Sequence, residues 1–281
     1  MSRALQGLHL HLEPTSGIAG DMAVAALVDA GVPGQVVTDA IGAMGVEGLR
    51  ARFERRRRGA FVGRSFVVSW PGSARRSPRR EDAHGHGHEH ARDDHHPHHG
   101  HGVATYEHDH RDYAEVKRLL GGARLDTDAR ALASDIFARI AHVEAALHGT
   151  RVDRVTFHEV GAYDSIADVV GAAAAIAWLA PSSIGSLPLV VGTGRVQTAH
   201  GELPVPAPAT AALLRGVPVL AEGQGELTTP TGAAIVAAIV DAFGPPPPLS
   251  IEAIGYGAGR RELADRPNVL RVLVGRRVGR A

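Results

Sequence analysis

The segment FHEVGAYDSIAD, residues 157–168, gathers four ionisable side chains around one predicted strand-to-helix turn. His158 and Glu159 follow a short apolar strand, and Asp164 and Asp168, four residues apart, lie on one face of the helix that follows. Imidazole and carboxylate donors suit hard and borderline divalent cations. The spacing therefore predicts a metal site, and the alternative is a pair of solvated like charges, which costs little free energy.

Two turns that precede predicted helices could bind a phosphate group. SGIAGD (16–21) offers glycines for close backbone approach, and ELTTPTGAAI (226–235) offers threonines, each before the free N–H groups of a helix. Neither turn matches GxGxxG or the P-loop, and the second is equally well explained as a helix N-cap followed by proline. The phosphate-binding candidates are Ser16, Gly17, Gly20, Thr229, Thr231 and Gly232.

Eleven of the 17 histidines lie in one tract between His84 and His110. The surrounding residues, 71–110, have almost no apolar side chains to offset the ~1–2 kcal/mol of backbone entropy lost per ordered residue, so we expect a disordered linker. Such a tract suits nickel, zinc or copper for loading or buffering, but cannot hold a catalytic geometry, and an inert linker is the alternative. The metal-loading candidates are His84, His86, His88, His90, His95, His96, His98, His99 and His101.

Other histidines stand in patterns with ordinary structural explanations. His9 and His11 project from one face of a predicted strand, where core or surface histidines are common. Glu144 and His148 share one face near a helix C-terminus, which favours a protonated imidazole. His200 carries little information in isolation.

Composition narrows the classes of function. Lys+Arg and Asp+Glu both number 30, so the overall charge provides no attraction to nucleic acid or to an anionic membrane. Cysteine is absent, which excludes disulfides and thiolate ligands and leaves imidazole and carboxylate as metal donors. We find no signal-peptide pattern and no apolar run near the roughly twenty residues that span a bilayer. A cytoplasmic protein is expected.

The hydrophobic patterns predict both strands and helices. Leucines alternate with histidines over residues 8–12, and alternation over 49–54 and 66–70 predicts an antiparallel hairpin with the solvated Arg55–Arg58 run near its tip. Spacings of three and four predict a helix from Asp126 to His148, capped by Asp126 or Thr127 and by Gly149.

Further helices are expected over 164–179, 207–215 and 231–243, and a hairpin around 192–194. The fold class is α+β or α/β, with mixed sheets and packed helices interrupted by the histidine-rich insertion. We expect residues 1–70 and 111–281 to form the core, with 71–110 as the linker and the metal and substrate site in the second part.

Taken together, seven segments in one order resemble the LarC-type nickel insertion proteins of nickel-pincer cofactor biosynthesis. They are SGIAGDM (16–22), the histidine tract, EAALHG (144–149), FHEVGAYDSIADVVGA (157–172), AHGELPVPAPATAALL (199–214), EGQGELTTPTGAAI (222–235) and IGYGAGRRELADRPNVLRV (254–272).

The resemblance implies a lyase-class cyclometallase that inserts Ni²⁺ into pyridinium-3,5-bisthiocarboxylic acid mononucleotide and consumes CTP. The substrate would supply the soft sulfur ligands, so a cysteine-free chain need only deliver nickel from nitrogen and oxygen donors. His158, Glu159, Asp164 and Asp168, with Asp21 as a further candidate, would then hold the metal, and Glu159 or His200 would take the ring proton.

The sequence departs from the family pattern in three places. Glu13-Pro14 stands where Asp-Cys is common, Gln197-Thr198 replaces a common Lys-Cys, and the family's C-terminal domain, associated with CTP, does not follow Ala281. We therefore expect the CTP site to lie outside this chain, on a partner chain that supplies this domain. The sequence does not decide whether the protein forms an oligomer.

Two other functions remain open at this stage. One is a nickel buffer or chaperone in which the histidine tract is the whole function. The other is a metal-dependent phosphate-ester hydrolase that uses the same histidine and aspartate side chains.

Overall fold

A computed structural model of the 281-residue chain describes residues 3–71, 73, 111–157, 160, 162–198 and 200–279. The predicted linker lies outside these residues except at 71 and 73, so the structure does not address its nine metal-loading histidines. His158 and Glu159 also lie outside the described residues.

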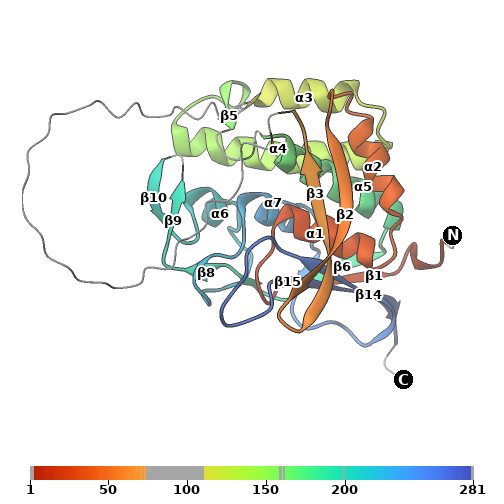
Figure 1. Ribbon diagram of the computed structural model, residues 1–281. Coiled ribbons are helices and arrows are strands. Elements are labelled where there is room, and N and C mark those ends of the chain that lie inside the picture. The colour runs from red at the N-terminus through yellow and green to blue at the C-terminus, as the bar shows by residue number, and fades with distance from the viewer. Residues whose placement is uncertain are drawn as a thin grey trace, which may run out of the picture.

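Helices and short strands alternate along the described part of the chain (Figure 1). The α-helices are α1 (Gly20–Asp29), α2 (Gly34–Gly42), α3 (Tyr113–Gly122), α4 (Thr127–His148), α5 (Tyr163–Leu179), α6 (Pro208–Leu213) and α7 (Pro230–Ile239). The strands are β1 (His9–Glu13), β2 (Arg50–Arg58), β3 (Phe61–Ser69), β4 (Arg111–Asp112), β5 (Thr156–Phe157), β6 (Ser183–Ser186), β7 (Leu189–Val190), β8 (Gly192–Thr193), β9 (Arg195–Thr198), β10 (Gly201–Pro204), β11 (Val219–Leu220), β12 (Gly225–Glu226), β13 (Ala242–Phe243), β14 (Leu249–Ala258) and β15 (Val269–Arg277).

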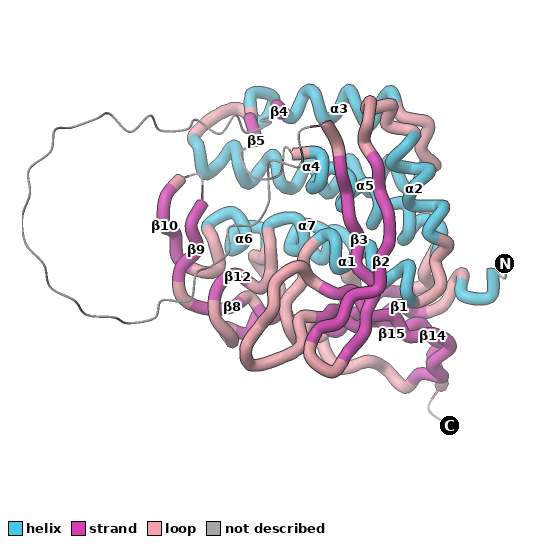
Figure 2. The backbone as a smooth tube through the Cα atoms, in the orientation of Figure 1, coloured by secondary structure: helices cyan, strands magenta, loops and turns pink. Residues whose placement is uncertain are grey.

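The main sheet has seven strands in the order β13-β6-β1-β15-β14-β3-β2 (Figure 2). β1 runs parallel to β6 and antiparallel to β15, whereas β14 runs antiparallel to β15 and parallel to β3. Strands from both sides of the histidine tract therefore share one mixed sheet. This arrangement confirms the expected combination of a mixed sheet and packed helices, in an α+β fold.

The helices gather on one side of the main sheet, and the long β2–β3 hairpin extends over them (Figure 1). α1 packs against β14 and β3, and α5 contacts α1, α2 and α4. The alanine-rich sequence of α5 explains its central place, because small side chains let neighbouring helices approach closely and leave most of this helix buried. No helix among the described residues is long and apolar enough to cross a membrane.

Two glycines of β14 set the position of α1. A Cβ added to Gly255 would overlap the carbonyl of Ala26, and one added to Gly257 would overlap the carbonyl of Met22. The backbone of the helix therefore rests directly on the backbone of the strand, which only glycine permits. This contact fixes where the N-terminus of α1 points.

Several predicted elements are confirmed. α4 begins after Asp126, whose side chain accepts N–H groups of the first turn, and ends at Gly149 in the left-handed conformation (φ 60°). β2 and β3 form the expected hairpin, and α5 lies within one residue of its predicted bounds.

Two predictions about turns are wrong. The Arg55–Arg58 run is not a solvated turn, since it belongs to β2 and Arg58 is buried with its guanidinium bonded to three backbone carbonyls. The expected hairpin around 192–194 is also absent, because β8 pairs with β12, and the hairpin is formed by β9 and β10. In both cases distant backbone partners decide the conformation.

Candidate functional site

A cavity of about 360 Å³ opens where the N-termini of α1, α5 and α7 meet the connection between β14 and β15. Three aspartates and two arginines line it, namely Asp21, Asp164, Asp168, Arg260 and Arg261. We refer to this cavity as the helix-terminus pocket. The other residues that line it are Ala19, Gly20, Met22, Val160, Ser165, Glu226, Leu227, Thr229, Pro230, Thr231, Gly259, Leu263 and Asn268.

Gly20 brings α1 and α5 together at the floor of the pocket. An added Cβ would lie 2.6 Å from the Cβ of Asp168 and 2.9 Å from the Cγ2 of Thr231. The absence of a side chain brings the backbone N–H of Asp21 close enough to the Asp168 carboxylate to oppose the rise in its pKa. The backbone N–H of Met22 in turn opposes the rise in the pKa of Asp21. Two carboxylates thus occupy the positive end of α1, where the helix dipole favours them.

Asp168 is the most constrained acid of the pocket. It is 9% exposed, and its Oδ1 has no hydrogen-bond partner among the described residues. Burial, followed by the charge of Asp21, raises the pKa of Asp168 well above its usual range. A buried carboxylate oxygen without a donor requires a cation, a proton or water. Asp168 is therefore the residue that most clearly indicates a ligand.

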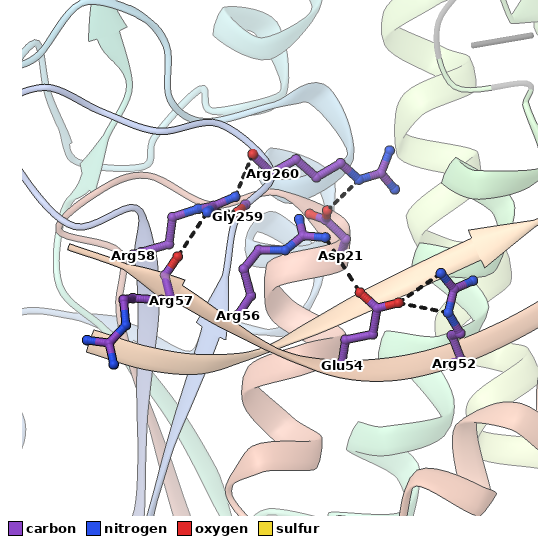
Figure 3. Close-up of polar contacts among 8 residues, drawn as sticks. All are labelled: Asp21, Arg52, Glu54, Arg56, Arg57, Arg58, Gly259 and Arg260. Carbon is purple, nitrogen blue, oxygen red and sulfur yellow. Dashed lines mark hydrogen bonds and ion pairs between the residues drawn. The ribbon is translucent and has the colours of Figure 1, made fainter. Parts of the chain in front are cut away.

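Asp21 and Asp164 share the guanidinium of Arg260 (Figure 3 shows the Asp21 contact). Arg260 Nε lies 3.0 Å from Asp21 Oδ2, and its Nη1 lies 3.9 Å from Asp164 Oδ2. Burial raises the pKa of Asp21, and the nearby Arg260 opposes that rise. One arginine thus partly neutralises three carboxylates.

The backbone beside Arg260 is held from the other side of the pocket by Arg58 (Figure 3). The buried guanidinium of Arg58 donates to the carbonyl of Gly259 at 2.8 Å and to that of Arg260 at 2.6 Å. Two residues earlier on β2, Arg56 pairs with Glu54 at 3.8 Å. The charge of Arg56 also opposes the rise in the pKa of Asp21. The arginine run therefore supports the pocket.

The predicted phosphate-binding residues divide into two groups. Gly20, Thr229 and Thr231 line the pocket, whereas the Ser16 hydroxyl donates to the carbonyl of Pro267. Gly17 and Gly232 are packing positions, because a Cβ would overlap Leu227 at the first and Ile18 at the second. Thr229 caps α7 by accepting the N–H of Gly232. The backbone N–H groups of Asp21 and Met22 already face the carboxylates of Asp168 and Asp21, so the N-terminus of α1 offers little to a phosphate.

His200 lies beside a different pair of residues. Its ring centroid is 5.0 Å from that of His148, whose Nε2 is 3.2 Å from Glu144 Oε2. The β9–β10 turn is fixed by Thr198, whose hydroxyl accepts the N–H of His200 and donates to Gly201. His200 is not among the residues that line the helix-terminus pocket. The structure thus joins two motifs that sequence reasoning treated separately.

His9 and His11 form a buried pair on β1, with ring centroids 5.8 Å apart. His9 Nδ1 is bonded to the Ser183 hydroxyl, and a Cβ at Gly185 would lie 2.7 Å from His11 Nδ1. Burial lowers the pKa of both imidazoles. These histidines are part of the packed structure on the sheet face opposite Leu10 and Leu12.

The metal site predicted from FHEVGAYDSIAD is described only in part. Asp164 and Asp168 share the pocket with Asp21, as their helical spacing and the α1 contact bring them together. Within the described ranges, no three histidine or acidic side chains are arranged as ready metal ligands. Arg58 and Arg260 were not expected at the pocket, and the only signal for Arg260 was its place in the glycine-rich GYGAGRR segment.

Comparison with known proteins gives a consistent result. The family model described as nickel insertion protein matches residues 10–280. A "Putative nickel insertion protein" of Geobacter sulfurreducens is 45% identical over 95% of this chain and 61% of its own length. No solved structure shows a significant match.

Two further relatives carry a more specific name, pyridinium-3,5-bisthiocarboxylic acid mononucleotide nickel insertion protein. The protein from Geobacillus kaustophilus is 41% identical over 95% of this chain, and that from Nocardioides sp. is 40% identical over 94%. The present chain covers 59% of each of them. It therefore spans about three fifths of the length of the curated relatives that it matches.

Proposed function

Because this chain belongs to the nickel insertion protein family, we propose that it binds Ni²⁺ and a pyridinium bisthiocarboxylate mononucleotide for the step that joins them. Nickel is the cargo of this reaction, which forms nickel–sulfur bonds and a nickel–carbon bond. The proposal includes a requirement for CTP, at a site in the part of the relatives' length that these 281 residues do not span. The activity is that of a lyase.

The observation that carries the proposal is the unpartnered Oδ1 of Asp168 in a pocket that also exposes helix N-termini. Carboxylate oxygens bind a divalent cation, and free N–H groups at a helix N-terminus bind an anion. A protein that joins a metal ion to a mononucleotide needs both kinds of group within one cavity. The helix-terminus pocket supplies both.

We place the nickel at Asp164 and Asp168, with Asp21 beside them. His158 and Glu159, immediately before α5, would complete the set with an imidazole and a carboxylate. Nitrogen and oxygen donors hold Ni²⁺ less strongly than the soft sulfurs of a thiocarboxylate. Transfer from the protein to the substrate would therefore be favourable.

We place the phosphate of the substrate at the N-termini of α5 and α7. The methyl group of Ala162, the N-cap residue of α5, accepts no N–H group of the first turn, where Ser165 N–H donates to the Asp164 carboxylate. At α7, Thr231 lines the pocket. Of the two phosphate sites expected from sequence, the one at Thr229 and Thr231 is thus favoured over the one at Ser16.

The ring proton displaced by nickel needs a base, for which we propose Glu159 or His200. His200 lies beside the imidazole of His148, which is paired with the Glu144 carboxylate, and these two groups would help to carry a proton away. Separate Glu159→Gln and His200→Asn variants, assayed for product at equal nickel occupancy, distinguish these two assignments.

Reconstitution tests the proposed function. The chain is mixed with Ni²⁺, CTP and the bisthiocarboxylate precursor, with and without the C-terminal segment of a relative, and products are followed by mass spectrometry. We expect a nickel adduct that is lost with Asp168→Asn and retained with Asp39→Asn, an acid outside the pocket. No adduct in any mixture would contradict nickel insertion.

The two alternative functions give different results. A nickel buffer predicts that deletion of residues 84–110 abolishes tight binding in equilibrium dialysis. Our proposal predicts that about one tight nickel ion remains after that deletion and is lost with His158→Ala plus Asp164→Ala. A hydrolase would instead release phosphate from simple nucleotides without the precursor.

A further inference from the structure

Arg260 reaches the carboxylates of the helix-terminus pocket from its open side. Its side chain is 53% exposed, whereas that of Asp21, with which it pairs at 3.0 Å, is 9% exposed. The guanidinium therefore has a direct route to solvent, although its partner does not. An ion pair of this kind, half in water, is weak enough to exchange.

The backbone that carries this side chain is held separately. Arg58 donates to the carbonyls of Gly259 and Arg260, while Asn268 Nδ2 donates to the carbonyl of Arg261. The N–H of Gly259 also donates to the carbonyl of Asn268. Rotation of the Arg260 side chain thus requires no movement of the loop.

The charge in the pocket is not balanced by Arg260 alone. The guanidinium of Arg260 contacts Asp21 and Asp164 and leaves the buried Oδ1 of Asp168 without a partner, whereas that of Arg261 donates to the backbone carbonyl of Glu226. A divalent cation would satisfy this oxygen and provide twice the charge. Arg260 now lies between the carboxylates, which explains why they are not arranged as ready ligands in the described residues.

We propose that Arg260 is a displaceable counterion: its guanidinium holds the place of the metal in the empty pocket and moves into solvent when a divalent cation binds. This inference rests on the proposed function, because it requires the metal to bind at Asp21, Asp164 and Asp168. Competition with the Arg260 guanidinium weakens metal binding. Once the metal has left, the same guanidinium returns and partly balances the charge of the carboxylates. Such a pocket can both accept and release its cargo.

Calorimetric titration with Ni²⁺ tests the proposal on the full chain. The nine tract histidines are replaced by serine in every protein, so that the pocket dominates the signal. Arg260→Gln should bind nickel about fivefold more tightly than its parent, as expected when one half-exposed ion pair no longer competes. Arg260→Lys keeps a cation and should return most of the parental affinity. Arg266→Gln, on the same loop but outside the pocket, should match the parent.

The outcomes separate the two hypotheses. Unchanged or weaker binding by Arg260→Gln would overturn the displaceable counterion, provided that Asp168→Asn has lost the site. If Asp168→Asn binds nickel as tightly as the parent, the metal lies elsewhere, and the proposed site itself fails. Equal melting temperatures of Arg260→Gln and Arg266→Gln would exclude a general loss of structure as the cause.

Discussion

The guanidinium of Arg58 donates a 2.6 Å hydrogen bond to the carbonyl oxygen of Arg260. The β2–β3 hairpin therefore fixes the backbone from which the Arg260 side chain extends into the helix-terminus pocket. Arg58 is buried, and its bonds to the Gly259 and Arg260 carbonyls are charge-assisted. This contact links the arginine run of β2 to the carboxylates of α1 and α5.

Arg58→Ala should destabilise the protein by about 1–3 kcal/mol, the usual cost of leaving buried acceptors without donors. Urea denaturation followed by circular dichroism measures this change. Arg57→Ala is the matched control, because Arg57 is exposed and its side chain should contribute less than about 0.5 kcal/mol. Equal stability of the two variants would contradict a supporting role for Arg58.

Gly20→Ala should also destabilise the fold, by about 1–3 kcal/mol, since the new methyl group would overlap Asp168 and Thr231. Gly121→Ala in α3 is the opposite case, because nothing lies within 4 Å of the added Cβ and alanine favours a helix. Thermal melting of the two variants should shift in opposite directions. A parallel shift would argue against close packing at the pocket floor.

Asp168→Asn should separate stability from binding. Burial raises the folded pKa of Asp168 above its unfolded value, so the contribution of this residue to stability is lost as pH rises through the folded pKa. The amide avoids burying a charge, and the variant should be at least as stable as the wild type, with an advantage that grows with pH. Its nickel affinity should nevertheless fall.

Urea denaturation at several pH values, together with equilibrium dialysis, measures both properties of Asp168→Asn. A strongly destabilised variant at neutral pH would show that the carboxylate serves the fold. Asp39→Asn, an exposed change elsewhere, should alter neither property.

Acidification should destabilise the β1 region through His9 and His11. Their folded pKa values are lowered by burial, so their contribution is complete above the unfolded pKa of about 6.5 and is lost as pH falls below it. His11→Leu should reduce the slope of unfolding free energy against pH between about 6.5 and 5. His142→Leu, at an exposed position of α4, should keep the wild-type slope.

The histidine tract should matter only when nickel is scarce. Replacing its nine candidate histidines by serine should leave insertion unchanged at saturating Ni²⁺ and lower it at limiting Ni²⁺, because a loading segment raises the local metal supply without holding the reacting ion. Product formation measured over a nickel titration checks this. Equal loss at all nickel concentrations would indicate that the tract belongs to the reacting site.

Local patterns predicted the elements that depend on local physics. The spacing of apolar residues and the caps at Asp126 and Gly149 located α4, and alternation located β2 and β3. Helical spacing likewise placed Asp164 and Asp168 on one face, as their common place in the pocket confirms. Side-chain periodicity and helix capping depend on residues that are close in the sequence, so both can be predicted from a single sequence.

Contacts between distant segments could not be predicted in this way. Nothing in the sequence indicates that Arg260 lies against Asp21, that Arg58 is buried, or that His200 lies beside His148. These neighbours are decided by strand order and by the close packing of α1 on β14. The sequence therefore predicted the aspartates of the pocket, but it did not predict that Arg58 and Arg260 would lie beside them.

The seating of α1 on Gly255 and Gly257 has a consequence for synthesis of the protein. The ribosome releases α1 early and β14 more than two hundred residues later, so the helix that carries Asp21 lacks this support until β14 has been made. The pocket closes only after β14 has emerged. A chain that has not yet reached β14 thus lacks the complete cavity, and no ligand can be held there before that strand has emerged.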